Sequence, residues 1–214
     1  MRMIIFGCGY SGAAIAKAAL ATGAHATGTV RTDDKLQTLH AQGIPGAIFD
    51  GTRLNPELLA ELTQATHLVQ SIPPGVAGDP LLALLGEDIG RICPNLRWIG
   101  YLSTVGVYGD SGGGWVDEDT PCQPKPGRSQ ERVEAEHAWI AEGARHGVPV
   151  AVLRLAGIYG PGRNAFVNLH RGTAKRIIKK NQVFNRIRVE DIGSASTFLG
   201  ERRIDGIFNI ADDE

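Results

Sequence analysis

The sequence predicts an α/β protein in which helices cover both faces of a doubly wound, mostly parallel sheet, in three layers. Short apolar, β-branched runs alternate with helical patterns over nearly the whole chain. A glycine-rich loop joins the first apolar run to the first helical pattern. The chain has 214 residues, enough for one domain with a substantial core. We therefore expect a single domain over residues 1–214.

Seven strands are expected where apolar runs are bounded by turn signals. They cover residues 3–6, 25–30, 46–50, 66–72, 97–103, 148–155 and 206–211. Helical patterns lie between them, at residues 13–23, from 33 onward, and at 56–65, 79–92 and 129–147. The Gly- and Pro-rich residues 109–127 are expected to form a long surface loop beside the carboxyl ends of the strands.

The overall composition is that of an ordinary globular protein. Hydrophobic residues make up 43%, charged residues 21%, and the net charge is −1. Nothing in this balance points to nucleic acid or a membrane surface as a partner. The three cysteines have no CxxC spacing, and the six histidines form no i, i+4 pair. We therefore expect no disulfide framework, no metal site and a cytoplasmic location.

The apolar start of the chain, "MRMIIF", allows a second interpretation as a secretory signal. Gly7, Gly9 and Gly12 interrupt the apolar stretch, and Lys17 follows it, whereas a signal peptide needs an unbroken apolar core. No segment reaches the roughly 18 uncharged apolar residues of a membrane span. A buried strand that runs into a nucleotide-binding helix is the favoured interpretation.

The loop after the first expected strand has the spacing G-x-G-x-x-G, in the order Gly7-Cys8-Gly9-Tyr10-Ser11-Gly12. The first glycine permits the tight turn, the second lets the backbone approach a pyrophosphate, and the third lets the helix pack against the strand. The N-terminus of the helix adds free N–H groups and partial positive charge. The loop therefore predicts a Rossmann-like dinucleotide site, although glycines also serve plain turns.

The end of the second expected strand indicates which dinucleotide is bound. Arg31 and Thr32 stand where an NAD site has an acidic residue that binds the ribose 2′-hydroxyl. A guanidinium suits a 2′-phosphate instead, so NADP is expected, with NAD as the alternative. Asp50, at the end of the third strand, is expected in the same site. Asp33 and Asp34 are interpreted as caps of the next helix.

Four motifs further along the chain are typical of one family. They are "YLSTVGVYGD", "WVDEDTPCQP", "AVLRLAGIYGPGR" and "NRIRVEDIG". In this order the sequence resembles the extended short-chain dehydrogenase/reductases, which include the nucleoside-diphosphate-sugar epimerases and dehydratases. The resemblance implies an NAD(P)-binding domain followed by a substrate lobe. Because the chain stops soon after its last strand, we expect a reduced or missing lobe, to which residues 160–190 contribute, or an incomplete sequence.

The resemblance also implies a hydroxyl residue after the fifth strand and a Tyr-x-x-x-Lys pair on the next helix. The hydroxyl position falls on Thr104, with Ser103 beside it. Over "PGRSQERVE", Pro126 takes the tyrosine position and Gln130 the lysine position, so the proton-transfer pair is missing. Gly157 stands where the family often has an asparagine.

Several residues are weaker candidates to replace the missing pair: Tyr108, Tyr159, Arg132, Asp117 and Glu118. Each has an ordinary structural interpretation as well, in a packed turn, on a helix surface or in a solvated loop. Cys8 is expected to be a packing residue rather than a nucleophile. The basic run at 171–188 is interpreted as a diphosphate site or, more simply, as a solvated face. Asp191 is expected to cap or orient the segment that follows this run.

Together these features predict an NADP-dependent oxidoreductase or epimerase that acts on a hydroxyl or carbonyl group of a small molecule. A nucleotide sugar is one candidate substrate, and a homodimer is one option for the assembly. The alternative is an NADP-binding sensor or scaffold without turnover, which the missing pair favours.

Overall fold

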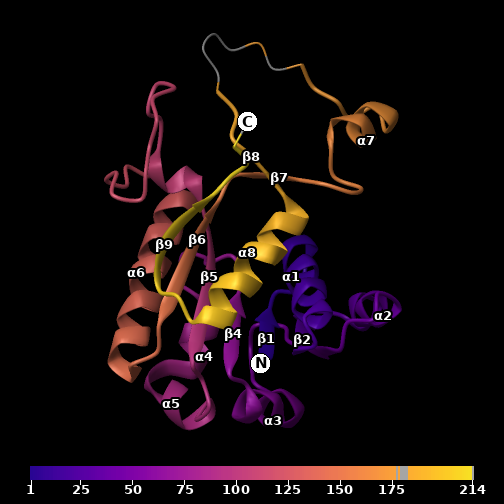
Figure 1. Cartoon of the computed structure of the whole chain (residues 1–214), viewed down its shortest axis with the longest axis vertical. Coiled ribbons are helices and arrows are strands. Elements are labelled where there is room, and N and C mark those ends of the chain that lie inside the picture. The colour runs from indigo at the N-terminus through magenta and orange to yellow at the C-terminus, as the bar shows by residue number, and fades with distance from the viewer. Residues whose placement is uncertain (177, 179–182, 214) are drawn as a thin grey trace.

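The computed structural model describes residues 1–176, 178 and 183–213, and it confirms the predicted fold class (Figure 1). Within these residues one sheet has seven strands in the order β3-β2-β1-β4-β5-β6-β9. All neighbouring strands run parallel. The strands are β1 (Arg2–Phe6), β2 (His25–Val30), β3 (Gly46–Ile48), β4 (His67–Gln70), β5 (Trp98–Thr104), β6 (Val150–Leu155) and β9 (Gly206–Ile210).

Helices cover both faces of this sheet, and each face has its own apolar core. On one face α1 (Tyr10–Ala21), α2 (Asp33–Ala41) and α8 (Val189–Arg202) pack against the strands. On the other face lie α3 (Pro56–Gln64), α4 (Pro80–Leu85), α5 (Ile89–Ile92) and α6 (Arg128–His146). The strand order reverses between β1 and β4, and such a reversal places ligands at the carboxyl edge of a parallel sheet.

The first strand and helix form as their sequences predict. Residues 3–6 of β1 are almost fully buried, as expected for a strand covered on both faces. In α1 the buried residues are Gly12, Ile15, Ala16 and Ala19, which share one helical face at 3–4 residue spacing. Their small side chains allow α1 to lie close to the sheet.

Several expected elements have different boundaries. The single helix expected at 79–92 divides into α4, a 3-10 turn at Gly86–Asp88 and α5, because the backbone at Gly86 turns to φ +51°. The strand expected at 46–50 ends at Ile48, and the strand expected at 66–72 covers only His67–Gln70. The shorter β4 leaves residues 71–74 free to pass beside the glycine loop.

The sequence analysis missed four elements between β6 and β9. These are β7 (Gly157–Tyr159), α7 (Ala165–His170), β8 (Arg186–Arg188) and α8. β7 and β8 pair in parallel as a separate two-stranded sheet. α8 is the crossover that lets β9 lie parallel to β6. Its buried residues, including Val189, Ile192, Ser196 and Leu199, follow a helical spacing that the sequence already shows.

The segment around α7 and the loop at 109–127 project from the same end of the molecule as the C-terminus (Figure 1). Residues 177 and 179–182, which include Lys179 and Lys180 of the basic run, lie outside the described residues. The substrate-side lobe at 160–190 therefore stays a prediction. No described helix combines the length and apolar character needed to cross a membrane.

One buried carboxylate ties three elements on the α6 face together. Asp79 caps α4 by accepting hydrogen bonds from the N–H groups of Leu81 (2.9 Å) and Leu82 (3.1 Å). It also accepts from Nε2 of Gln70 on β4 (2.8 and 2.9 Å) and from Nε1 of Trp139 on α6 (3.1 Å). Because these bonds satisfy the carboxylate, the core tolerates a residue that is only 5% exposed.

Helices α1 and α8 touch through their backbones on the opposite face, where the glycine-loop helix is held. A Cβ atom on Gly193 of α8 would lie 2.7 Å from the carbonyl oxygen of Ala14 and 3.3 Å from Cβ of Ala18. No side chain fits at this distance without moving one helix. The position of α1 therefore depends on a glycine in α8.

We expect Gly193→Val to lower the free energy of unfolding by about 2 kcal/mol, because the added carbons push α8 away from α1. Urea denaturation measures this change. Ser194→Ala, at the neighbouring exposed position, is the control and should stay within about 0.5 kcal/mol of the wild type. Equal stability of the two variants would contradict the close packing of α1 on α8.

Candidate dinucleotide and active site

The glycine loop is fixed by hydrogen bonds to β2. The N–H of Gly7 donates to Oγ1 of Thr29 (3.1 Å), and the N–H of Cys8 donates to the Thr29 carbonyl (2.7 Å). Gly7 has a φ of +81°, a left-handed conformation that favours glycine. The loop therefore takes its turn at the first glycine, as predicted from the spacing.

The three glycines leave the space that a bound pyrophosphate needs. A Cβ atom on Gly7 would lie 2.9 Å from the side chain of Ile72, and one on Gly12 would lie 2.9 Å from the Gly7 carbonyl oxygen. Gly9 is exposed, and a Cβ there would meet only the Gly7 carbonyl oxygen, at 4.0 Å. The first and third glycines thus permit close packing, while the second leaves an open approach to the backbone.

The N-terminus of α1 also fits an anion. Gly9 is its N-cap residue, with no side-chain capping bond and no acidic residue in the first turn. The first-turn N–H groups, including those of Tyr10 and Ser11, therefore have no competing carboxylate within their own turn. A pyrophosphate bound over Gly9 would accept from these groups.

Cys8 lies inside the loop and points into the core. A Cβ atom on Gly28 of β2 would lie 2.4 Å from its sulfur, so the thiol fills the space above that glycine. Burial raises the pKa of the Cys8 thiol to about 12, which keeps it protonated at neutral pH. The side chain is therefore a packing residue, as expected from the sequence.

Tyr10 connects the glycine loop to the segment after β7. Its hydroxyl donates to the Pro161 carbonyl (3.0 Å), and the guanidinium of Arg163 lies 5.6 Å from the ring centre. Behind this contact a cavity of about 740 Å³ extends between α1, α2 and α8. Lys17 and Lys35 line it, and neither was singled out from the sequence.

The predicted 2′-phosphate residues lie at the carboxyl end of β2. Arg31 and Thr32 follow the last residue of the strand and are exposed. The N-cap of α2 is Thr32, so the prediction that Asp33 and Asp34 cap this helix is wrong. They occupy its first turn instead, where their negative charges interact favourably with the helix dipole.

Asp50 follows the end of β3 and forms a local turn. Its Oδ1 accepts from the N–H (2.9 Å) and the hydroxyl (2.7 Å) of Thr52. These hydrogen bonds lower the pKa of Asp50, which therefore stays ionised at neutral pH. The exposed carboxylate is at the same edge of the sheet as the glycine loop.

The end of β5 presents two hydroxyl groups to different surroundings. Ser103 is buried and donates to the carboxylate of Glu136 on α6. Thr104 is half-buried, and its Oγ1 accepts from the N–H of Gly106 (3.1 Å). Because Oγ1 accepts this bond, the Thr104 hydroxyl proton can be donated to another group.

A buried ion pair joins α6 to β6 beside this site. Nη2 of Arg154 donates to Oε2 of Glu136 (2.8 Å), and the two side chains are 4% and 1% exposed. Nη1 of Arg154 donates to the hydroxyl of Tyr108 (2.8 Å), which donates to Oδ1 of Asn209 on β9 (2.8 Å). Nη2 also reaches the sulfur of Cys122 (3.2 Å). Of this network only Tyr108 was a predicted candidate.

The helical face of α6 decides between the two interpretations of Arg132, as a residue at the site or on a solvated helix surface. Gln130 is exposed and donates to Glu134 on the same helix (3.0 Å). Arg132 and Glu136 share the face that meets the sheet, and Nη1 of Arg132 donates to the Leu102 carbonyl and to the Tyr101 hydroxyl (3.4 Å). Arg132 therefore places a positive charge against β5, two residues before Thr104, rather than in solvent.

The remaining candidates have structural partners. Tyr159 is hydrogen-bonded to Asp212, which raises the pKa of its phenol and keeps it protonated at neutral pH, so little phenolate is present to act as a base. Asp117 is exposed and accepts from Thr120 (2.6 Å). Oε1 of Glu118 accepts from the N–H of Asn209 (2.7 Å), which anchors the 109–127 loop to β9.

Other predicted positions lie away from the site. Pro126 is an exposed loop residue before α6, and Gly157 is in the β7–β8 pair. Asp191 is exposed in the first turn of α8. The three cysteines are free, and no described group of three His, Cys, Asp or Glu side chains could hold a metal.

No protein-family model matches the chain, but individual proteins do. A conserved protein of unknown function from Silicibacter pomeroyi DSS is 41% identical, with a TM-score of 0.88, and the match covers all of this chain and 73% of that one. Protein YeeZ of Escherichia coli K12 is 29% identical over 98% of this chain and 77% of its own length.

More distant solved structures show the same fold. A UDP-glucuronic acid 4-epimerase from Bacillus cereus, solved in complex with NAD, has a TM-score of 0.77 at 19% identity and covers all of this chain and 79% of its own. Structural neighbours include further members of the NAD-dependent epimerase/dehydratase family.

The fold and the glycine loop thus define a Rossmann-like α/β protein. The chain belongs to the same family as the functionally unknown Silicibacter protein, with which it shares 41% of its residues.

We expect Glu136→Gln to lower the free energy of unfolding by about 3 kcal/mol, because it leaves the buried Arg154 guanidinium without its carboxylate. Urea denaturation followed by circular dichroism measures the loss. Glu134→Gln removes an exposed carboxylate from the same helix and should cost less than about 1 kcal/mol. If the two variants were equally stable, the ion pair would not hold α6 on β6.

Proposed function

We propose that the chain is an NADP-dependent oxidoreductase or epimerase that acts on a hydroxyl or carbonyl group of a small molecule. A nucleotide sugar is one candidate substrate. The observation that carries this proposal is the open backbone at Gly9, which shares one edge of a parallel sheet with the hydroxyl of Thr104. The cytoplasmic location and the homodimer also stay predictions.

The residues at this edge would each hold a different part of the cofactor. The loop from Gly7 to Gly12 would receive the pyrophosphate on main-chain N–H groups. Arg31 and Thr32 would bind the 2′-phosphate, and the exposed carboxylate of Asp50 would contact the adenosine end. With NAD bound instead, Arg31 would have no phosphate partner. The bound dinucleotide supplies hydride transfer.

Thr104 and Arg132 are the residues that would act on the substrate. The Thr104 hydroxyl is free to donate its proton in a hydrogen bond, because its oxygen already accepts from Gly106. A substrate oxygen at this position would be oriented by that hydroxyl. Arg132 would add positive charge at the same end of β5 and so favour a developing negative charge on that oxygen.

The second candidate function is a binding protein that holds NADP without turnover. One observation favours it: the hydroxyl of Tyr108 is engaged between Arg154 and Asn209, so this candidate tyrosine is not free to transfer a proton. Incubation of the chain and NADPH with a panel of carbonyl compounds and nucleotide sugars separates the two functions. Tight binding without NADPH consumption would support the binding protein and contradict the enzyme.

We expect Arg31→Asp to weaken NADP binding by about tenfold or more, because the 2′-phosphate loses a charged donor and meets a carboxylate. NAD binding should stay the same or improve. Calorimetric titration with both dinucleotides checks this. Arg202→Asp makes the same charge change at the end of α8 and should leave both affinities unchanged. An unchanged NADP-to-NAD ratio in Arg31→Asp would remove Arg31 from the site.

We expect Thr104→Val to reduce turnover about a hundredfold or more with any substrate that the wild-type chain converts, because the orienting hydroxyl is lost. Cofactor affinity should stay within about twofold. Thr63→Val, an exposed change on α3, is the matched control. Full activity in Thr104→Val would show that the hydroxyl has no role in the reaction.

A further inference from the structure

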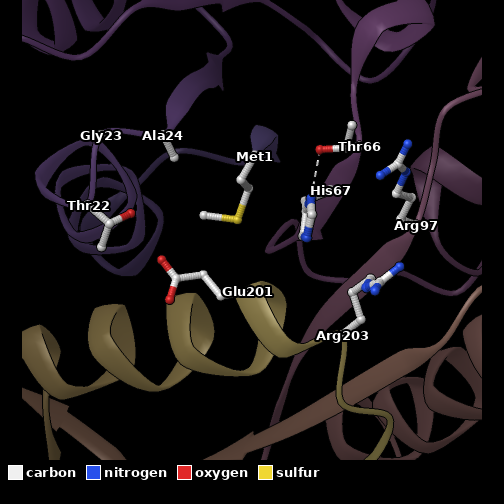
Figure 2. Close-up of a pocket in the computed structure, with 9 residues that line it drawn as sticks. All are labelled: Met1, Thr22, Gly23, Ala24, Thr66, His67, Arg97, Glu201 and Arg203. Carbon is white, nitrogen blue, oxygen red and sulfur yellow. Dashed lines mark hydrogen bonds between the residues drawn. The ribbon is translucent and has the colours of Figure 1, made fainter.

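A second cavity, of about 390 Å³, lies at the opposite edge of the sheet from the glycine loop (Figure 2). Its walls come from the turn after α1, the starts of β4 and β5, and the end of α8. They include Thr22, Thr66, His67, Arg97, Glu201 and Arg203. Nothing in the proposed function uses this cavity, because the cofactor and Thr104 belong to the carboxyl edge.

Two arginines line this cavity on the same side. Arg97 comes just before β5, and Arg203 follows the last residue of α8. Figure 2 shows both side chains on the side of the pocket where His67 lies. Within the described residues, neither guanidinium has a hydrogen bond or an ion pair with another side chain. Both residues are exposed, so two positive charges lie at the border of the cavity without a carboxylate partner in the described part of the chain.

Arg203 is in a conformation that normally belongs to glycine. It follows α8 in the left-handed region, with φ +53° and ψ +42°, and no other described non-glycine residue has a positive φ. The comparable position after α6 is Gly147, with φ +65° and ψ +29°. An L-residue is strained here, so an arginine at this point indicates a use for its side chain.

His67 forms the floor of the cavity without contributing charge. One ring nitrogen, Nδ1, lies 2.8 Å from Oγ1 of Thr66, and Nε2 lies 2.9 Å from the Gly200 carbonyl. Burial is the main reason why the pKa of His67 lies below its ordinary value, and the amino group of Met1, Arg203 and Arg97 lower it further. The ring therefore stays neutral at pH 7, and the positive charge around the pocket comes from the two arginines and the amino group of Met1.

Glu201 places a negative charge on the wall of the cavity opposite the arginines. Figure 2 shows its carboxylate on the far side from the arginines, toward Thr22. An anion would therefore be attracted to the side formed by Arg97 and Arg203 and repelled from the opposite wall. The planar, forked donors of two guanidinium groups match the oxygens of a phosphate or carboxylate.

We propose that this cavity binds a small oxyanion, a phosphate or a carboxylate group, through the guanidinium groups of Arg97 and Arg203. The site is independent of the cofactor and of the reaction. It explains why an arginine, and not a glycine, follows α8.

Calorimetry and thermal unfolding with inorganic phosphate and with succinate test the proposal and show which of the two oxyanions binds. In Arg203→Gly the left-handed strain disappears, so Tm without anion should rise by about 2–4 °C. The same variant should lose about tenfold or more of its affinity for the anion. A variant that is more stable yet binds less cannot be explained by misfolding.

Three further variants make the test specific. Arg97→Gln should also weaken binding, and it covers the case in which Arg203→Gly does not fold. Arg202→Gln removes a charge that lies over the ring of Phe198, with its guanidinium carbon 4.0 Å from the ring centre, and should leave binding unchanged. Glu201→Gln should strengthen binding, because a repulsive carboxylate is removed.

The decisive quantity is the difference in anion affinity between the wild type and Arg203→Gly, because phosphate can also bind at the glycine loop. The proposal is overturned if neither anion raises the Tm of the wild type, or if Arg203→Gly binds as tightly as the wild type. An equal loss in Arg202→Gln would likewise overturn it, since the effect would then be general surface charge.

Discussion

The pairing of Arg154 with Glu136 is the interaction on which the active edge of this molecule depends. A guanidinium that is 4% exposed cannot remain charged in the core without a carboxylate and further acceptors. Glu136, Tyr108 and Cys122 supply them from α6, from the turn after β5 and from the 109–127 loop. The pair thus sets the distance between α6 and the sheet, and with it the position of Arg132 against β5.

The two ends of the sheet offer different chemical groups to a charged ligand. At the carboxyl edge, the glycine loop offers main-chain N–H groups, and its shape is enforced by close contacts at Gly7 and Gly12. At the amino edge, the cavity offers side-chain guanidinium groups on a neutral histidine floor. A backbone site is insensitive to most substitutions except those of its glycines, whereas a side-chain site can be removed one arginine at a time.

Local patterns predicted the fold and the glycine loop, because both depend on residues that are neighbours in the sequence. Buried β-branched runs and the spacing of Gly7, Gly9 and Gly12 are of this kind. Helix α8 was missed because the basic run before it obscured its start, although its buried positions keep a helical period. The single helix predicted at 79–92 is divided at one residue, Gly86, whose backbone has a positive φ.

The network around Arg154 could not be predicted in the same way. Arg154 stands inside the apolar run 148–155, which indicates a buried charge, but its partner Glu136 lies 18 residues away on a helix rich in charged residues and is not distinguished from them by the sequence. The family motif places Gln130 at the position of the lysine, but it does not say on which face of α6 that residue lies. The structure shows that this face is exposed and that Arg132 meets the sheet.

The role of Asn209 determines when during synthesis the site can form. Its side chain holds the Tyr108 hydroxyl, and its backbone N–H holds Glu118, so β9 completes contacts that begin about a hundred residues earlier. The hydrogen bonds that hold Gly7 and Cys8 come from β2, so they can form early in synthesis. The region around Thr104, by contrast, reaches its final geometry only after the last strand has emerged and docked.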